Sequence, residues 1–222
     1  MYDSEITESV KPKRAYNSAR RQAQAEATRL GILDAAHRLF LRDGYVTTTV
    51  EAIAAEADVS AKTVYDAFAT KAGVLRAVWD LRLKGDTDDA PVAVRPWFVE
   101  LLEEPDPRRM VALIAHNSVV VKQRIGDLLR VIRSAASVDA DSAALWQLIT
   151  TDFHANQRAL VDAIAKRKGL RAGLSVGQAT DVLWMLNHPD TWLNLHGERG
   201  WSAKEFEKWF TQSARMLLLK GD

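Results

Sequence analysis

The chain has 222 residues, 47% of them hydrophobic, and its 30 Lys and Arg residues nearly balance 29 Asp and Glu residues. This length and apolar content predict a soluble, globular protein of one or two domains and exclude intrinsic disorder as its main state. The absence of cysteine excludes a disulfide framework, thiolate metal sites and cysteine nucleophiles, and it is compatible with a cytoplasmic protein.

The N-terminal segment is basic, although the whole chain is nearly neutral. Between Lys11 and Arg29 the sequence has six Lys and Arg residues and a single acidic residue, Glu26. Such a segment is a common means of binding a polyanion, because each cation placed on a phosphate releases a counterion. A solvated tail has the same composition and is an equally good interpretation. We assign residues 1–21 to a flexible basic arm.

The part of the chain after the arm is predicted to be helical. No proline lies between Lys13 and Ala90, and the one cluster of β-branched residues, at 46–50, does not alternate as a strand would. Apolar residues instead recur at spacings of three and four, which indicates an amphipathic helix that ends at Gly44. These apolar residues are Ile32, Leu33, Ala36, Leu39 and Phe40.

Two short helices joined by a tight turn follow this helix. Thr48 and Glu51 have the spacing of a capping box, which predicts a helix that begins at Thr49, and Ser60 is the predicted N-cap of a second helix. The turn between them contains Asp58, a residue that tolerates a left-handed backbone at modest cost. This is the geometry of a helix-turn-helix, whose second helix fits the major groove of DNA.

Helices are predicted through the rest of the chain as well, so the expected fold class is all-α. A helix near 72–84 comes first, and Pro91 and Pro96 then mark a linker or a bent connection. Asp106 and Pro107 have the pattern of an N-cap followed by proline at the first helical position. Further helices are expected near 107–122, 125–137, 141–168, 175–195 with a bend at Pro189, and 202–219, which Ser202 and Glu205 open as a capping box.

These residues form a long pattern, which resembles the TetR family of transcriptional regulators. The pattern comprises Ile32-Leu33-Asp34-Ala35-Ala36, Leu39-Phe40, Gly44-Tyr45, the run from Thr48 to Ala54, Val59-Ser60, Thr63-Val64-Tyr65, Phe68, Lys71 and Leu75. It covers about residues 28–80, and weaker similarity at 104–109, 183–184, 189 and 198–201 extends it over nearly the full length. The resemblance implies a three-helix DNA-binding domain with a helix-turn-helix over residues 22–71. An all-helical regulatory and dimerisation domain would follow over residues 72–222.

The resemblance also implies a set of DNA contacts. Lys62, in the first turn of the recognition helix, can reach either a guanine edge or a phosphate, and the hydroxyl of Tyr65 is expected on the DNA backbone. Lys71 begins the next helix, where its charge opposes the helix dipole, and a nearby phosphate would explain this. The full set of expected contacts is Thr48, Thr49, Ser60, Ala61, Lys62, Thr63, Tyr65 and Lys71, in which Thr48 acts chiefly as a cap.

Two further sites are expected in the second domain. Polar and aromatic residues that interrupt apolar helices suggest a mostly apolar effector pocket, although a packed core with satisfied polar groups is an equal alternative. The expected pocket residues are His116, Asn117, Trp146, Phe153, Trp184 and Asn187. By resemblance the last two long helices form a dimer interface, unless they only close the monomer core. The expected interface residues are Leu183, Leu186, Trp192, Phe206, Phe210 and Leu217.

No catalytic, metal or cofactor site is indicated. The five histidines lack the spacing of metal ligands, and no glycine-rich phosphate loop, nucleophile elbow or dinucleotide motif occurs. No apolar run is long enough to span a membrane. We therefore expect a cytoplasmic, homodimeric repressor that a small, largely apolar effector releases from double-stranded DNA, with the helix near 72–84 coupling the two sites. An all-helical enzyme and an interaction module that does not bind DNA are the alternatives.

Overall fold

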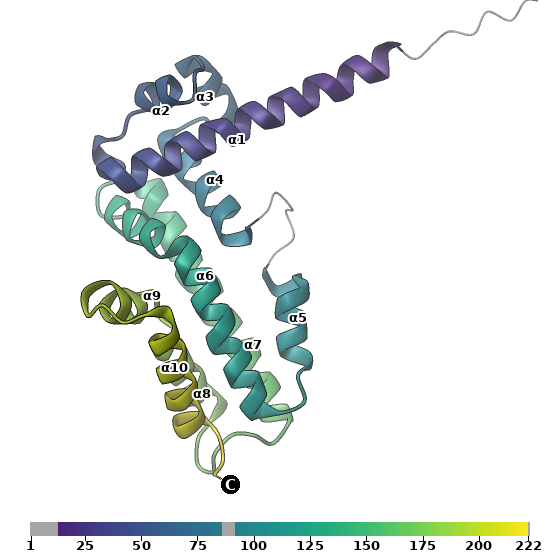
Figure 1. Ribbon diagram of the computed structural model, residues 1–222, viewed down its shortest axis with the longest axis vertical. Helices are drawn as coiled ribbons and strands as arrows, with labels where there is room; N and C mark the ends of the chain where they lie inside the picture. Colours follow the sequence, from purple (N-terminus) through teal and green to yellow (C-terminus); the bar gives the residue numbers. More distant parts are fainter. Residues whose placement is uncertain (1–12, 86–91, 222) are drawn as a thin grey trace, which may run out of the picture.

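The computed structural model describes residues 13–85 and 92–221, and within these residues the chain is all-helical, as predicted. An isolated antiparallel bridge joins Leu170 to Leu219. The helices are α1 (Lys13–Thr47), α2 (Val50–Glu56), α3 (Ala61–Phe68), α4 (Lys71–Lys84), α5 (Pro96–Glu103), α6 (Pro107–Ala135), α7 (Ala140–Lys166), α8 (Val176–Leu186), α9 (Pro189–Trp192) and α10 (Ala203–Leu218), with a 3-10 turn at Val92–Val94 and a π-helical turn at Leu193–Glu198 (Figure 1).

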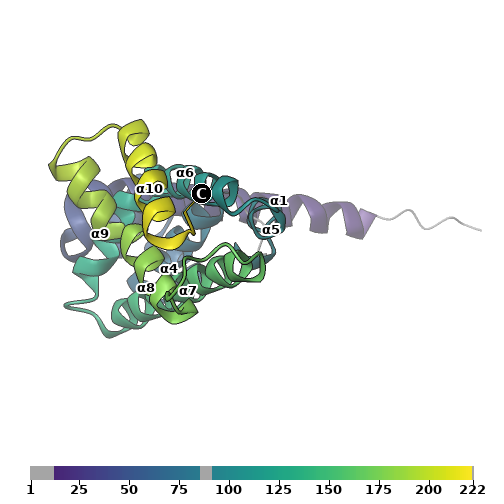
Figure 2. The ribbon, with the colours of Figure 1, turned by 90° about the horizontal axis from the view of Figure 1, so that it is seen from below.

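The molecule is elongated, with α1, α2 and α3 at one end and the C-terminus at the other (Figure 1). The long helices α6 and α7 run along the body, and α8 and α10 pack beside them. The N-terminal half of α1 projects away from the body, which both views show (Figures 1 and 2). None of the described helices is long and apolar enough to cross a lipid bilayer.

Helix α1 is longer than the sequence predicts at its start, and it continues to Thr47, past a kink at the predicted end, Gly44. Residues 13–21 are helical, so the prediction of a flexible arm up to residue 21 is wrong for them, and the rest of the predicted arm, residues 1–12, lies outside the described residues. This stretch has no proline after residue 12 and no cap to stop a helix. At the other end, Gly44 has φ 80° and interrupts the regular helix, as the pattern predicts.

Two apolar clusters form the core, and α6 contributes to both. The first joins α1, α2, α3 and α4 to the C-terminal half of α6 and the start of α7, through residues such as Phe40, Leu75 and Leu128. The second packs α5, the N-terminal half of α6, and α7, α8 and α10 around Phe206 and Phe210. The boundary predicted at residues 71 and 72 therefore crosses the first cluster, since α4 and α6 belong to it as fully as α1 does.

The middle of the chain differs from the prediction in two places. The helices expected at 107–122 and 125–137 are one continuous helix, α6. Gly126 lies inside it where Trp192 packs closely, since a Cβ there would stand 3.1 Å from the indole Nε1, so this glycine allows a close approach and does not break the helix. The expected linker contains α5, because Pro96 occupies its first turn, where a missing N–H costs nothing.

The C-terminal helices follow the predicted caps and bend. Helix α8 ends at Leu186, and the chain turns at His188 before Pro189 begins α9, which confirms the bend. Ser202 and Glu205 form the predicted capping box, with Ser202 Oγ accepting from the Glu205 amide at 3.2 Å. A second capping box, formed by Ser175 and Gln178, opens α8.

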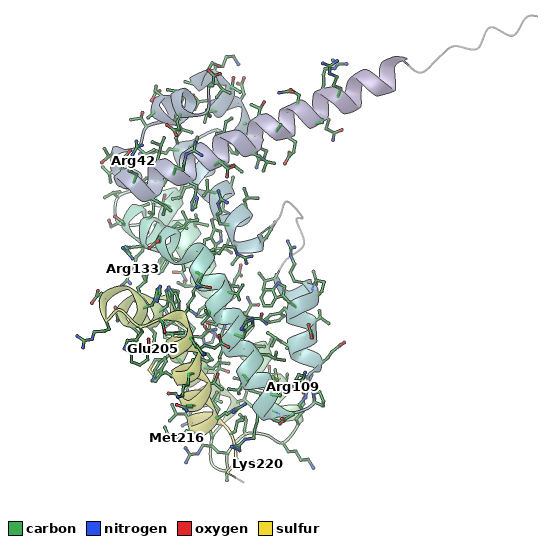
Figure 3. All side chains as sticks on the ribbon, viewed as in Figure 1. Arg42, Arg109, Arg133, Glu205, Met216 and Lys220 are labelled. Carbon is green, nitrogen blue, oxygen red and sulfur yellow. The ribbon has the colours of Figure 1, made fainter. Side chains whose placement is uncertain are left out.

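Most of the residues expected at a dimer interface are buried within the monomer. Five of them, Leu183, Leu186, Trp192, Phe206 and Phe210, are at most 4% exposed and belong to the second apolar cluster. The prediction that they contact a partner is wrong, because their side chains close the core between α6, α8 and α10. Leu217 is half-buried. The outer sides of α8 and α10 carry Met185 and Met216, which are 54% and 71% exposed, and Met216 is labelled in Figure 3.

Candidate nucleic-acid interface and internal pocket

Helix α2 begins with a cap one residue later than the sequence predicts. Thr49 is the N-cap, and its hydroxyl accepts from the Ala52 amide at 3.1 Å. Thr48 is 2% exposed and donates its hydroxyl to the Gly44 carbonyl at 2.8 Å. The predicted capping box of Thr48 and Glu51 is therefore wrong, because Thr48 serves the end of α1. Thr49 and Glu51 are exposed at the start of α2.

The turn between α2 and α3 has the expected left-handed residue. Asp58 has φ 54°, and the Val59 amide donates to the Ala54 carbonyl at 3.0 Å. Ser60 is the N-cap of α3, as predicted, and accepts from the Thr63 amide at 3.1 Å. These bonds fix the angle between the two short helices without a glycine in the turn.

The outer face of α3 presents the predicted DNA contacts to solvent. Val64 and Phe68 are buried beneath it, whereas the side chain of Lys62 is 81% exposed and Tyr65 is 46% exposed. The Lys62 ammonium lies 2.6 Å from a carboxylate oxygen of Asp66, one turn along the helix. The foremost candidate for reading a base therefore already has an anionic partner within its own helix. Ala61 and Thr63 are half-buried at the start of the same helix.

Lys71 has a different environment from the one predicted. Its ammonium donates to the carbonyls of Tyr45 at 2.8 Å and Thr48 at 2.9 Å, and it lies 4.2 Å from the centre of the Tyr45 ring. Burial lowers the pKa of this amine. Carbonyls at the end of α1 and the Tyr45 ring therefore compensate the charge, so the structure accounts for Lys71 without the predicted phosphate. These partners are more than twenty residues away in sequence, so no local pattern could indicate them.

The joint between α3 and α4 is a close contact that the sequence analysis missed. Ala69 has φ 62°, and the Thr70 amide donates to the Phe68 carbonyl at 2.7 Å, which forms a γ-turn. Gly73, in the first turn of α4, packs on the same carbonyl so closely that a Cβ would stand 2.1 Å from its oxygen. The joint thus requires glycine at 73 and fixes α3 against α4.

Helix α1 contributes basic groups at the same end of the molecule as α3 (Figure 1). Arg29 lies 4.5 Å from the centre of the Phe68 ring, and its guanidinium donates to the Ala67 carbonyl at 3.5 Å. Arg20 is exposed on the part of α1 that projects beyond the body. Exposed hydroxyls, a phenol and cations therefore share one end of the molecule, which is a pattern suited to a polyanion.

A cavity of about 430 Å³ lies between α4, α5, α6, α7 and the end of α8. Four of the six predicted pocket residues line it, namely Asn117, Trp146, Phe153 and Asn187. His116 and Trp184 do not, so the prediction is wrong for these two. His116 is exposed on another side of α6, 3.3 Å from a carboxylate oxygen of Glu207, and Trp184 packs on the outer side of His188 with ring centres 4.6 Å apart.

The cavity walls are largely apolar and aromatic. The aromatic side chains that line it come from α4, α5 and α7, and they are Trp79, Trp97, Phe98, Trp146 and Phe153. Helix α4 contributes Leu83 as well, so this helix begins at the helix-turn-helix and ends in the wall of the cavity. Both the size and the lining are typical of sites for small organic molecules.

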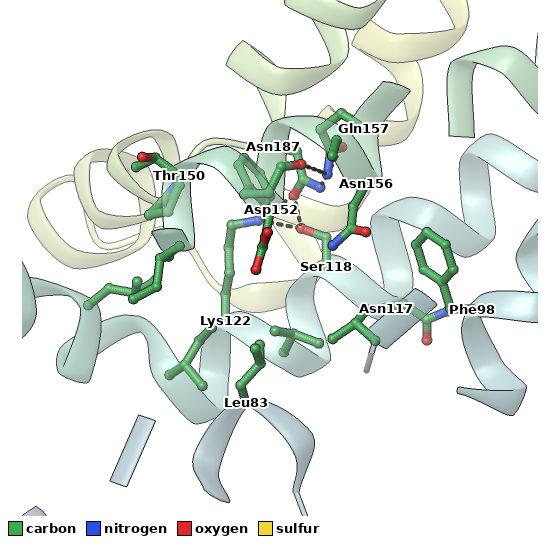
Figure 4. Close-up of a pocket in the computed structure, with 18 of the residues that line it drawn as sticks. Leu83, Phe98, Asn117, Ser118, Lys122, Thr150, Asp152, Asn156, Gln157 and Asn187 are labelled. Carbon is green, nitrogen blue, oxygen red and sulfur yellow. Dashed lines mark hydrogen bonds between the residues drawn. The ribbon is translucent and has the colours of Figure 1, made fainter. Parts of the chain in front are cut away.

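One wall of the cavity carries a buried polar cluster, which we call the Lys122 cluster. It comprises Ser118 and Lys122 on α6, Gln157 on α7 and Asn187 at the end of α8 (Figure 4). The Lys122 ammonium donates to Ser118 Oγ at 2.5 Å and to Asn187 Oδ1. The side-chain Nδ2 of Asn187 donates to Gln157 Oε1 at 3.1 Å. All four residues are buried, and desolvation lowers the pKa of Lys122 to about 7.

Of this cluster the sequence analysis identified only Asn187. The signal for the rest was present in α6, where Ser118 and Lys122 stand one turn apart on the apolar side of an amphipathic helix. A lysine on that side of a helix is unusual and marks either an ion pair or a ligand site. Among the described residues, no group of three or more His, Asp or Glu side chains is arranged to hold a metal ion.

Comparison with known proteins agrees with this geometry. Residues 32–78 match the family model described as "Bacterial regulatory proteins, tetR family". The HTH-type transcriptional regulator HbdR from Aromatoleum sp. (strain CIB) is 37% identical over 120 residues, which is 54% of this chain and 50% of HbdR. The match thus spans about half the length of this curated relative.

Solved structures share the fold over most of the chain. The complex of SmeT with triclosan has a TM-score of 0.67 at 22% identity and covers 87% of this chain and 92% of SmeT. NalD from Pseudomonas aeruginosa, the secondary repressor of the MexAB-OprM multidrug efflux pump, has a TM-score of 0.66 at 22% identity, covering 90% of this chain and all of NalD. At these identities the likeness establishes a common fold.

Proposed function

Since residues 32–78 match the model of the TetR family of bacterial regulatory proteins, we propose that the chain is a member of this family and a homodimeric repressor that a small, largely apolar molecule releases from its DNA operator. The family consists of DNA-binding transcriptional regulators and not of enzymes, so the enzyme alternative is set aside. We expect the protein to act in the cytoplasm, where its DNA lies.

The observation that carries the proposal is the exposed face of α3 above its buried face. Val64 and Phe68 anchor the helix, while Lys62 and Tyr65 extend into solvent. A helix held in this way can enter a major groove with its first turns against the base edges. The proposed contacts on or beside α3 are Thr49, Ser60, Ala61, Lys62, Thr63 and Tyr65. Thr48 and Lys71 leave this set because their polar groups serve the end of α1.

We expect a dimer because a single helix α3 can contact only a few base pairs of DNA. A single recognition helix contacts too few bases for a unique genomic site, so two must be held about 34–36 Å apart or at a related spacing. We propose that the outer sides of α8 and α10 form the two-fold interface as a four-helix bundle. Support comes from the exposed Met185 and Met216 and the half-buried Trp184, Trp209 and Leu217 on these helices.

Helix α4 is the proposed connection between the cavity and the DNA. Its first turn is fixed to α3 through Gly73, and its last turns place Trp79 and Leu83 in the cavity wall. Arg82 joins it to Asp34 of α1 at 2.5 Å. A ligand that displaces the cavity end of α4 would change the distance between the two recognition helices, provided that it binds one spacing better than the other. Of the proteins that share this fold, SmeT has been solved in complex with the small molecule triclosan, and NalD is a repressor.

The experiment is a gel shift with DNA from upstream of the protein's own gene and of the neighbouring genes. Wild-type protein should bind one such fragment far more tightly than random DNA. Lys62→Ala should weaken operator binding by about 1–3 kcal/mol and relax specificity at one base pair in each half-site if the lysine reads a guanine. An equal loss on random DNA would assign Lys62 to a phosphate instead. Lys166→Ala, at the exposed end of α7, is the matched control.

Failure to bind any fragment specifically would contradict the proposal and favour an interaction module that does not use DNA. The test should include Tyr65→Phe, which keeps the ring and removes the hydroxyl that we place on the DNA backbone. That variant should lose affinity on operator and random DNA alike, since a backbone contact carries no sequence information.

A further inference from the structure

The Lys122 cluster places an ammonium group in the wall of an apolar cavity without a negatively charged partner. An ammonium has three donors, and Lys122 uses two of them, on Ser118 and Asn187. Both acceptors are neutral, and no ion pair of Lys122 occurs among the described residues. A buried cation whose only partners are neutral is costly, because neutral acceptors do not replace its hydration.

The surroundings of the amine explain why this cost falls on it. The centre of the Phe206 ring lies 5.9 Å from the ammonium, and Lys122 also lines the apolar cavity. The other ionisable groups that border the cavity are Arg76, Asp80 and Lys84 on α4, Asp152 on α7, and His188. Arg76 and Asp80 pair with each other at 3.1 Å. None of these carboxylates lies within ion-pair distance of Lys122.

We propose that the cavity binds an apolar monocarboxylate, whose carboxylate accepts from the Lys122 ammonium while its aromatic or aliphatic body fills the rest of the cavity. This inference rests on the proposed function and gives a chemical class to the effector. The carboxylate would accept a hydrogen bond from the third N–H of the ammonium and would place a negative charge beside it. The neighbouring Asn187 amide and Ser118 hydroxyl would hold the amine in place. A neutral apolar ligand would leave the Lys122 ammonium without a negatively charged partner.

A carboxylate should therefore bind together with a proton. Above neutral pH the buried amine is largely uncharged in the free protein, whereas a bound carboxylate favours the charged form. Binding of an acid should then weaken roughly 15-fold between pH 7.0 and 8.5, because the fraction of protonated amine falls by about that factor. Binding of the corresponding amide should not change with pH.

The test uses the full chain and two matched pairs of probes, 4-phenylbutyrate with 4-phenylbutyramide, and octanoate with octanamide. The fluorescence of Trp79, Trp97 and Trp146, which line the cavity, reports binding without a label. Each acid that binds should do so at least 10-fold more tightly than its amide at pH 7.0. The two pairs distinguish an aromatic from an aliphatic body, and binding of either acid in this way supports the proposal.

Lys122→Met removes the charge and keeps an unbranched side chain. It should weaken the binding of the acid at least 10-fold, abolish its pH dependence, and leave the amide within about threefold of wild type. Because the other ionisable groups that border the cavity are unchanged in this variant, a pH dependence that survives overturns the proposal. Lys166→Met, at the exposed end of α7, is the surface control. The acid and amide comparison in wild type keeps the test decisive if Lys122→Met does not fold.

Equal binding of acid and amide, or no binding of either acid at millimolar concentration, overturns the assignment of a carboxylate. Operator binding measured in parallel separates this outcome from failure of the proposed function. If an amide releases the operator as well as its acid does, the proposed function as an effector-responsive regulator is supported and the proposed preference for a carboxylate is refuted. If an acid binds through Lys122 without releasing the operator, the carboxylate site is supported and the proposed release of DNA by this class of effector is refuted.

Discussion

The pKa of Lys122 makes the stability of the ligand-free protein depend on pH in a way that one substitution should remove. Burial lowers this pKa from the ordinary value of 10.5 to about 7. The gap corresponds to roughly 5 kcal/mol, at about 1.4 kcal/mol for each pH unit. Below pH 7 the amine is protonated in both the folded and the unfolded chain, so the folded protein bears this full cost. Above pH 7 the folded protein releases the proton while the unfolded chain keeps it, and the cost declines towards pH 10.5.

The free energy of unfolding should therefore gain about 2–3 kcal/mol from Lys122 between pH 7 and pH 9. Lys122→Met lacks this contribution. Other titrating groups are common to both proteins, and the loss of the amine's hydrogen bonds to Ser118 and Asn187 gives an offset that is the same at every pH. The variant should exceed wild type in stability most at pH 6 to 7, and this advantage should shrink by about 2–3 kcal/mol at pH 9.

The assay is urea unfolding followed by circular dichroism at pH 6, 7, 8 and 9, with one protein concentration throughout because oligomerisation contributes to stability. Lys166→Met serves as a control for loss of an exposed charge and should differ from wild type by a constant amount. If the difference between wild type and Lys122→Met does not change with pH, the amine is not desolvated, and the argument from its buried charge is refuted.

Four shorter predictions concern the DNA-binding end and the dimer. Asp66→Ala removes the partner of Lys62, so it should tighten binding to operator and random DNA alike and increase the salt slope by about one ion in gel shifts. Gly73→Ala should destabilise the fold by about 1–3 kcal/mol or more in urea unfolding, because its Cβ would overlap the Phe68 carbonyl. Ala69→Gly should stabilise it by about 1 kcal/mol, because glycine relieves the positive φ; a loss of stability would contradict the γ-turn. Met185→Glu should convert a dimer near twice 24.7 kDa into a monomer by light scattering, and an unchanged mass would exclude the outer side of α8 as interface.

The features that the sequence predicted best are those whose partners lie within one turn of helix. Ser60 and Ser202 cap helices as expected because each accepts from an amide three residues ahead. Asp58 adopts the expected left-handed conformation for the same local reason. Thr48 shows the limit of this approach, since two adjacent threonines fit the cap equally well and only contact with the end of α1 decides between them.

The features that the sequence missed depend on contacts between distant segments. Lys71 takes its partners from the end of α1, and the Lys122 cluster assembles from α6, α7 and the end of α8. Helical periodicity shows that Phe206 and Phe210 share a face, but it does not say whether a partner chain or α6 covers that face. Similarly, Trp184 and His116 have the right residue types for a pocket and lie on the wrong sides of their helices.

Helix α6 takes part in both apolar clusters, so the two clusters should neither unfold independently nor be exchanged separately. This helix of 29 residues spans about 43 Å, and unfolding either cluster would expose part of its buried surface. The two halves should therefore melt together as one cooperative unit. A chimera that joined residues 1–71 to the remainder of a distant relative would separate Phe40 from Leu75 of α4 and Leu128 of α6, which belong to the same apolar cluster. If α3 reads the operator as proposed, operator preference should be easier to alter by substitutions on the outer face of α3 than by exchange of the whole N-terminal module.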